Sequence, residues 1–313
     1  DIKLVAICDV RPEQLERKEN NDLNIEIKHE SFQADYNKYT SFKKMLDSEE
    51  MDYVDFAVPT YLHAEMAVAA LEHGFHVLSE KPMAMNVQQC ESMIQASLRS
   101  GKTLMIAQCL RFWPAYEELK RIVDSGEWGR VVSGMFFRGG DTPKWSFEDW
   151  LRKKDKSGGV LLDQHIHDVD TINWLFGTPD SVSTSALNVI PGSGYDAVST
   201  NYYYPDGKVI NAMDDWTING ARGFEMIFRV NFEKGCAELT RDGKLTLYPV
   251  GSDKVVPELE PDDGYYREIL YFVDCLKNGR QPERGTTAST METIRIAHAE
   301  MKSADNAGER VKL

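Results

Sequence analysis

The apolar and polar positions of the first 110 residues alternate between strand-like and helix-like segments. Apolar, β-branched runs typical of buried parallel strands occupy residues 2–8, 53–58, 76–79 and 103–108. Helical patterns occupy residues 41–46, 62–73 and 87–100, and a short helix is expected to open at Pro12 and end near residue 18. This alternation predicts right-handed βαβ crossovers and a parallel sheet covered by helices on both faces.

A different pattern begins after about residue 110. Helical patterns occupy residues 115–125, 157–176, 265–278 and 287–303, and a strand pattern occupies residues 130–137. Residues 181–250 read as strands separated by hairpin breaks such as Tyr204-Pro205-Asp206-Gly207 and Arg241-Asp242-Gly243. This stretch has room for about six strands, which predicts a large, mainly antiparallel open sheet.

The two patterns predict an α/β fold with two domains. Residues 1–112 are expected to form a Rossmann-type, doubly wound dinucleotide-binding domain, and residues 113–313 an α+β domain built on the antiparallel sheet. In such sheets a ligand binds outside the carboxyl ends of the parallel strands. We therefore expect a site in a cleft between the two domains.

Composition narrows the function classes. The 313 residues suggest about two domains, and a net charge of −14 argues against nucleic acid or an anionic membrane as the main partner. The five cysteines are scattered and include no C-x-x-C pair, a pattern that fits reduced thiols in a cytoplasmic protein better than disulfides or a zinc site. No apolar run approaches the roughly 18–20 residues of a membrane span.

Asp9 ends the first strand-like run. In dinucleotide-binding folds an acid at the end of the second strand hydrogen-bonds the adenosine ribose, and its charge favours NAD by repelling a 2′-phosphate. Arg11 could instead accept that phosphate, so NADP stays open. The alternative interpretation is that Asp9 only caps the helix that follows.

The Gly-rich phosphate loop that should come about 20 residues before such an acid is absent from this sequence. The first strand of a doubly wound sheet lies centrally, so a fold without it would leave unpaired strand edges in its core. We therefore expect that one strand, a Gly-rich turn and one helix, about 25–30 residues, precede Asp1.

Glu80-Lys81-Pro82 follows the strand-like residues 76–79 and should lie at the carboxyl edge of the parallel sheet. A lysine there can hydrogen-bond a reacting hydroxyl or relay a proton. The alternative is an exposed lysine in a loop.

The densest group of chemically versatile residues lies within 157–170. If this segment is helical, Asp163 and His167 stand at i and i+4 on one face, Asp170 extends that face, and His165 lies roughly opposite. A histidine is suited to proton transfer near neutral pH, and a carboxylate one turn away can orient it. A zinc site is the competing interpretation, but His165 and His167 diverge, so we expect no metal. Histidines with a purely structural role are the other alternative.

Gln108 and Arg111 lie where the last parallel strand leads into the second domain. Arg111 could bind an anionic or hydroxylated ligand group, or form an ion pair between the domains. Trp145 and Trp150 precede the histidine segment, and such aromatic rings either stack on sugar faces or fill a core.

Taken in order, these segments resemble the glucose–fructose oxidoreductase / inositol dehydrogenase / MocA (Gfo/Idh/MocA) family over essentially the whole chain. The matching pieces are residues 5–9, 58–63, 70–82, 111–114 and 158–163 with His167, and residues 297–302 and 311–313 near the end.

The resemblance implies hydride transfer between NAD, or NADP, and a sugar, polyol or related alcohol. It assigns Lys81 to the reacting hydroxyl and the nicotinamide ribose, His167 to the alcohol proton, and Asp163 to substrate orientation. It places Asp9, Pro59, Thr60, His63, Glu80 and Lys81 at the cofactor, and we expect Arg11 and Gln108 there as well. Arg111, Trp145 and His165 are expected at the substrate, His165 standing where the family usually has Gly.

The same resemblance leaves two other functions open. One is an NAD-dependent glycoside hydrolase, and the other is a non-catalytic, cofactor-binding regulator. The resemblance also implies a homodimer or homotetramer formed through the C-terminal sheet. We expect neither nucleic-acid nor membrane partners.

Overall fold

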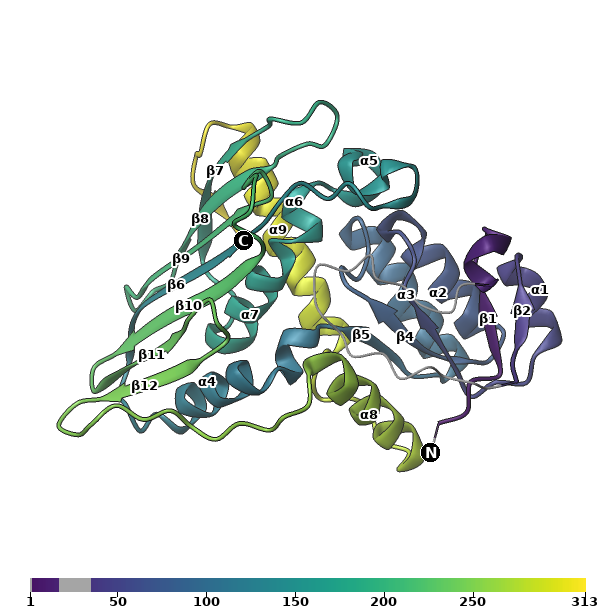
Figure 1. Cartoon of the computed structure of the whole chain (residues 1–313), viewed down its shortest axis with the longest axis horizontal. Coiled ribbons are helices and arrows are strands. Elements are labelled where there is room, and N and C mark those ends of the chain that lie inside the picture. The colour runs from purple at the N-terminus through teal and green to yellow at the C-terminus, as the bar shows by residue number, and fades with distance from the viewer. Residues whose placement is uncertain (1, 17–34) are drawn as a thin grey trace.

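The structure, a computed structural model, describes residues 2–16 and 35–313 (Figure 1). In its first half all described strands are parallel, as predicted. One sheet pairs β1 (Ala6–Cys8) with β2 (Asn37–Tyr39). The other has the order β3-β4-β5, with β3 at Tyr53–Phe56, β4 at His76–Glu80 and β5 at Leu104–Ala107. Within the described residues, no strand pairing joins these two sheets.

The helices of this half begin and end at the residues whose chemistry favours it. Ser41 and Asn86 cap α1 (Phe42–Ser48) and α3 (Val87–Ser100), each accepting a backbone N–H with its side chain. Gly101 ends α3 with a left-handed φ of 68°. α2 spans His63–Glu72 after a short 3₁₀ turn η2 (Thr60–Leu62). The helix expected from Pro12 is a 3₁₀ turn, η1 (Pro12–Glu16), and its expected end near residue 18 lies outside the described residues.

The second half contains an eight-stranded sheet in the order β12-β11-β10-β6-β9-β8-β7-β13. Its strands are β6 (Val131–Gly139), β7 (Ser181–Leu187), β8 (Ala197–Tyr203), β9 (Val209–Asp215), β10 (Glu225–Phe232), β11 (Gly235–Leu239), β12 (Leu245–Pro249) and β13 (Val311–Lys312). Only the β6–β9 pairing is parallel. The six strands expected between residues 181 and 250 are present, and β6 and β13 widen the sheet.

The prediction of one helix over residues 157–176 is wrong. α5 (Lys154–Ser157) ends where the expected helix was to begin, and the rest of the segment is divided into α6 (Val160–Asp163) and α7 (Ile166–Phe176). Gly158 and Gly159 separate the first two, with φ values of 80° and 70°. The carbonyl of Val160 accepts the N–H groups of both Gln164 and His165, which interrupts the regular i→i−4 ladder before α7.

The remaining helices complete the cores. They are η3 (Cys109–Phe112), α4 (Pro114–Ser125), η4 (Phe147–Arg152), α8 (Gly264–Lys277) and α9 (Thr287–Asp305). In Figure 1, α9 runs from the eight-stranded sheet, past α6 and α7, towards β5. None of the helices in the described ranges has both the length and the hydropathy needed to span a bilayer.

α9 belongs to two buried apolar clusters. The first core lies around α2, α3 and the β3-β4-β5 sheet and includes Ile294 and Ala297 of α9. The second core lies between the eight-stranded sheet and α4 and α7, and it includes Ile296 and Ala299. Leu162 of α6 packs in the first core. The segment that carries Asp163, His165 and His167 is therefore held against the parallel sheet.

Candidate active site

Lys81 and Asp163 meet where the two halves of the chain touch. Lys81 directly follows β4, and its Nζ donates to the Asp163 carbonyl oxygen at 2.6 Å and lies 3.3 Å from Oδ1 of the same residue. The two side chains keep 17% and 20% of their surface exposed. They are therefore fixed against each other while a ligand can still reach them.

His167 is the third member of the expected catalytic set, and it lies in the first turn of α7. Its side chain is half-buried, and within the described ranges its buried Nδ1 has no hydrogen-bond partner. Burial, reinforced by the nearby charges of Lys81 and Arg138, holds the pKa of His167 well below its usual value. The imidazole is therefore neutral near pH 7, the form that can accept a proton.

Glu80 and His63 shape the loops at this end of the parallel sheet. Glu80 Oε2 accepts the backbone N–H of Lys81 at 3.0 Å, and burial raises the pKa of Glu80 to about 7. His63 is 1% exposed, and its ring nitrogens lie 2.8 Å from the carbonyl oxygens of Pro82 and Val58. His63 thus joins the loops that follow β3 and β4, rather than presenting its ring at an open surface.

The other residues expected at the cofactor follow strands of the two parallel sheets. Thr60 and Gln108 are each 2% exposed, and Pro59 opens the η2 turn after β3. Asp9 follows β1, and its Oδ1 accepts the backbone N–H of Arg11 at 2.8 Å and lies 3.2 Å from the Arg11 Nε. The Arg11 guanidinium also lies 4.6 Å from the ring centroid of Phe147, in the second half of the chain.

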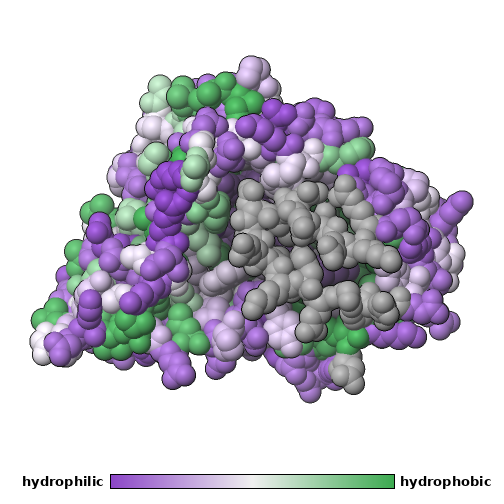
Figure 2. Space-filling model, viewed as in Figure 1, coloured by the Kyte–Doolittle hydropathy of each residue, from purple (hydrophilic) through white to green (hydrophobic). Residues whose placement is uncertain are grey.

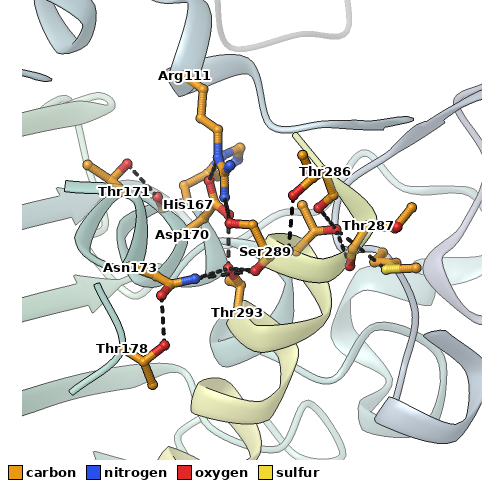
Figure 3. Close-up of polar contacts among 12 residues, drawn as sticks. Arg111, His167, Asp170, Thr171, Asn173, Thr178, Thr286, Thr287, Ser289 and Thr293 are labelled. Atoms are coloured by element: carbon orange, nitrogen blue, oxygen red, sulfur yellow. Dashed lines mark hydrogen bonds and ion pairs between the residues drawn. The ribbon is translucent and has the colours of Figure 1, made fainter. Parts of the chain in front are cut away.

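Arg111 does not reach a substrate site. Figure 3 shows it extending towards α7 and α9, where Nε and Nη2 donate to the two carboxylate oxygens of Asp170 at 2.8 and 2.7 Å. Nη2 also donates to Ser289 Oγ at 2.8 Å, and Thr293 donates to Asp170 at 2.9 Å. Arg111 and Asp170 are almost fully buried. Of the two interpretations of Arg111, the structure supports the ion pair between the halves.

His165 was expected at the substrate, and the structure places it elsewhere. Its side chain has no exposed surface, and Nδ1 lies 2.5 Å from Asp214 Oδ2 while Nε2 lies 3.4 Å from Glu300 Oε2. The break between α6 and α7 turns His165 inwards against the eight-stranded sheet, whereas Asp163 faces Lys81. A side chain enclosed in this way cannot contact a substrate.

Trp145 lies in the loop between β6 and η4 and is 50% exposed. No hydrogen bond or aromatic pair fixes it among the described residues, so its expected role as a sugar-stacking ring stays a prediction. Trp150 belongs to η4 and is half-buried.

Sequence reasoning missed three buried charges near this site: Arg138, Asp214 and Glu300. Arg138 follows Gly134 and Phe136 on the inward face of β6, and Asp214 follows Ile210 and Ala212 on the inward face of β9. An ionisable residue at an inward position of an alternating strand is the signal that could have identified Arg138 and Asp214, whereas Glu300 lies on α9. Within the described ranges, no three His, Cys, Asp or Glu residues are grouped to hold a metal ion.

Two models of one protein family match this chain. Residues 1–108 match the Gfo/Idh/MocA model described as an oxidoreductase family with an NAD-binding Rossmann fold. Residues 116–238 match the Gfo/Idh/MocA C-terminal domain.

Several characterised proteins are similar in sequence. A 2,7-anhydro-N-acetylneuraminate hydratase of Mediterraneibacter gnavus is 30% identical over 175 residues, which are 54% of this chain and 46% of the relative. The match thus spans about half of that relative's length. The 1,5-anhydro-D-fructose reductase of Ensifer adhaerens is 26% identical over 78% of this chain and 74% of its own. The inositol 2-dehydrogenase of Salmonella paratyphi B is 25% identical over 99% of this chain and 89% of its own.

Solved structures share the fold along almost the whole chain. A levoglucosan dehydrogenase in complex with NADH and levoglucosan has a TM-score of 0.82 at 21% identity, covering 98% of this chain and 89% of its own. An aldose-aldose oxidoreductase from Caulobacter crescentus, complexed with glycerol, has a TM-score of 0.82 at 24% identity, covering 99% of this chain and 92% of its own.

Proposed function

Because this chain belongs to the Gfo/Idh/MocA family of oxidoreductases, we propose that it transfers a hydride between a nicotinamide cofactor and a sugar, polyol or related alcohol. The observation that carries this proposal is the Lys81–Asp163 contact across the two halves, with a neutral His167 near the charge of Lys81. Oxidation of an alcohol by hydride transfer needs a base for the hydroxyl proton, and a nearby positive charge stabilises the negative charge that develops on the oxygen. A carboxylate can hold the substrate in place.

In this proposal His167 accepts the proton of the substrate hydroxyl in the oxidation direction and returns it in the reduction direction. The Lys81 ammonium hydrogen-bonds the same oxygen and stabilises the negative charge that develops there. Asp163 holds Lys81 in place and accepts a hydrogen bond from a neighbouring substrate hydroxyl. When bound, the nicotinamide supplies the hydride acceptor or donor. We propose that the exposed ring of Trp145 stacks on a face of the sugar.

The residues at the sheet edge fit such a cofactor. Asp9 and Glu80 place two carboxylates at the carboxyl ends of β1 and β4, where ribose hydroxyls can donate to them. We propose Pro59, Thr60, Lys81 and Gln108 as further cofactor residues, with His63 holding their loops together. The charge of Asp9 favours NAD, while Arg11 beside it leaves room for NADP.

Calorimetry and a substrate screen test the function. NADH and NADPH would each be titrated into the full-length protein, and sugars and polyols would then be screened with both cofactors by nicotinamide absorbance. We expect binding of at least one cofactor and turnover of at least one alcohol. Failure to bind either cofactor would overturn the proposal.

One comparison favours a second candidate. The Mediterraneibacter gnavus relative is a hydratase, so members similar to this chain are not confined to net oxidation and reduction. An enzyme of this kind, or an NAD-dependent glycoside hydrolase, would convert its substrate without accumulating NADH. Sugar release from an aryl glycoside, or water addition to an anhydro-sugar, at a constant NADH concentration would favour this candidate.

We also propose a homodimer or homotetramer, residence in the cytoplasm, and a domain boundary at residues 112–113. The outer face of the eight-stranded sheet exposes Val132, Val209 and Met213, and Figure 2 shows hydrophobic patches among hydrophilic ones in the region of this sheet. Sedimentation velocity tests the assembly, and a single species of about 36 kDa would contradict it.

A further inference from the structure

His165 occupies a special place in the chain, because it lies between the two residues proposed to act on the substrate. α6 ends at Asp163 and α7 begins at Ile166, so His165 lies in the corner that sets how Asp163 and His167 face each other. Its side chain turns away from both of them, towards the eight-stranded sheet. Whatever holds His165 therefore also fixes this corner.

Polar groups from three elements enclose the His165 ring. Asp214 of β9 lies 2.5 Å from Nδ1, and Glu300 of α9 lies 3.4 Å from Nε2. Tyr202 and Thr200 of β8 place their hydroxyl oxygens 3.3 and 3.4 Å from Nε2. Asp214 and Glu300, like the ring between them, have no exposed surface.

The charges continue from His165 back to α7. Arg138 Nε lies 4.0 Å from Asp214 Oδ1 and 3.1 Å from Asp168 Oδ2. Glu300, His165, Asp214, Arg138 and Asp168 therefore form a buried row in which acidic and basic groups alternate. Asp168 is the residue directly after His167, so this row holds the chain on both sides of His167.

The geometry indicates the charge state of His165. A neutral imidazole carries one N–H and can donate to only one of its two carboxylate neighbours. The Nε2 of a neutral ring would accept a hydrogen bond from the Tyr202 or Thr200 hydroxyl, but the buried carboxylate of Glu300, 3.4 Å away, would then face a ring without positive charge. The doubly protonated ring places a positive charge between the two carboxylates: it hydrogen-bonds Asp214 Oδ2 through Nδ1 and lies 3.4 Å from Glu300 Oε2, whose carboxylate has no hydrogen-bond partner among the described residues. The two carboxylates accordingly raise the pKa of His165 well above its usual value, despite its burial.

We propose that His165, as an imidazolium held between Asp214 and Glu300, is a positioning residue that fixes the α6–α7 corner and thereby aligns Asp163 with His167. The polar positions around it support this role. Asp168 and Asp170 are also anchored by buried arginines, and only His167 keeps an unpartnered ring nitrogen among the described residues of this turn. The kinetic part of the test below rests on the proposed function, because it needs a measurable turnover.

Histidine NMR tests the charge state without any turnover. The protein would be labelled with ¹⁵N-histidine, and the His165 signal would be assigned from the spectrum of His165→Gln. At about pH 8, above the ordinary histidine pKa of about 6.5, we expect both His165 nitrogens to be protonated. A neutral His165 ring at that pH would overturn the proposal.

The variant His165→Gln tests whether His165 aligns Asp163 with His167. In His165→Gln we expect kcat to fall by about tenfold to a hundredfold, with the dissociation constant of NADH changed less than about twofold. The NMR-derived pKa of His167 should rise towards its ordinary value, because the ring is no longer held in its buried position. An unchanged His167 pKa and an unchanged kcat would overturn the proposal.

Two further variants separate positioning from stability. Loss of the imidazolium leaves Glu300 without a cation, whereas Asp214 keeps Arg138 at 4.0 Å. His165→Gln/Glu300→Gln removes that unpaired carboxylate charge, so thermal stability should recover in part while kcat stays low. Recovery of kcat together with stability would show a merely structural role. Leu245→Ala, in β12 at the sheet edge, is the matched control that should lower stability and leave kcat unchanged. A wild-type protein without turnover would contradict the proposed function, while the NMR arm would still test His165.

Discussion

Side chains that are neighbours in sequence occupy different environments in the segment from Asp163 to Asp170. Asp163 faces Lys81, His165 and Asp168 are enclosed by buried charges, and Asp170 is paired with Arg111. Residue types and spacing were enough to single out this segment. They could not divide the segment into its roles, because the division depends on the helix break after Asp163 and on charges from β6, β9 and α9.

Replacing Lys81 by alanine tests the residue with the most direct proposed contact. Because a lone Asp163 cannot supply the positive charge, we expect kcat to fall by about two to four orders of magnitude. NADH affinity should fall far less than kcat, because Lys81 is only one of several proposed cofactor residues, and calorimetry would measure it. Lys43→Ala, at a lysine that is 77% exposed, is the control and should retain full activity. Turnover close to wild type in Lys81→Ala would contradict the assignment.

The pH dependence of oxidation should report His167. Protonation of His167 removes the base, so kcat/KM should fall as the pH drops through the pKa of this residue. Since burial and the charges of Lys81 and Arg138 lower that pKa, the acid limb should lie below about pH 6.5, the ordinary histidine value. Initial rates across the acidic range would measure it. An acid limb above that value would exclude His167 as the base. In a separate measurement, the variant His167→Asn should lose most of its activity at every pH.

At the scale of the element, most helices and strands could be predicted, because their signals are local. Gly101 and Asn86 bound α3 through their own backbone and side-chain chemistry, and hairpin turns mark the strands after residue 181. The division of residues 154–176 into three helices could not be read from periodicity. It depends on contacts with β8 and the loop before it, far along the chain.

Gly159 gives a test of that division. Its φ is 70°, and a Cβ at this position would lie 2.5 Å from the Ser193 carbonyl oxygen. We expect Gly159→Ala to destabilise the protein by at least about 1–3 kcal/mol and to lower kcat, because α6 carries Asp163. Denaturant unfolding and initial rates would measure both. Gly192→Ala has a similar φ of 85° but open space around the Cβ, so it should be milder in both assays.

At the scale of the whole molecule, the two halves share a helix. The sequence predicted two domains divided near residue 112, yet Leu162, Ile294 and Ala297 lie in the first core together with α2 and α3. Periodicity alone cannot show this, because α9 presents one set of residues to each core. The sharing implies that the two halves unfold together.

Ile294→Ala tests this coupling. Ile294 is 1% exposed in the first core, so we expect a loss of about 2–5 kcal/mol. All six tryptophans lie at or after residue 113, so tryptophan fluorescence reports on the second half alone. In Ile294→Ala, the unfolding midpoint followed by tryptophan fluorescence should shift by as much as the midpoint followed by circular dichroism. Leu98→Ala, at a 70% exposed position, should shift neither, and a fluorescence midpoint unaffected by Ile294→Ala would show independent halves.

The place of α9 in both cores also has a consequence for synthesis of the protein. Chains usually fold domain by domain as they leave the ribosome, the N-terminal part first. Here the first core contains Ile294 and Ala297, which are made after nearly all of the residues they pack against. Until residues 287–305 have emerged, α2, α3 and the parallel strands lack part of their apolar cover. The nascent first half should therefore depend on chaperones for longer than a self-contained nucleotide-binding domain would.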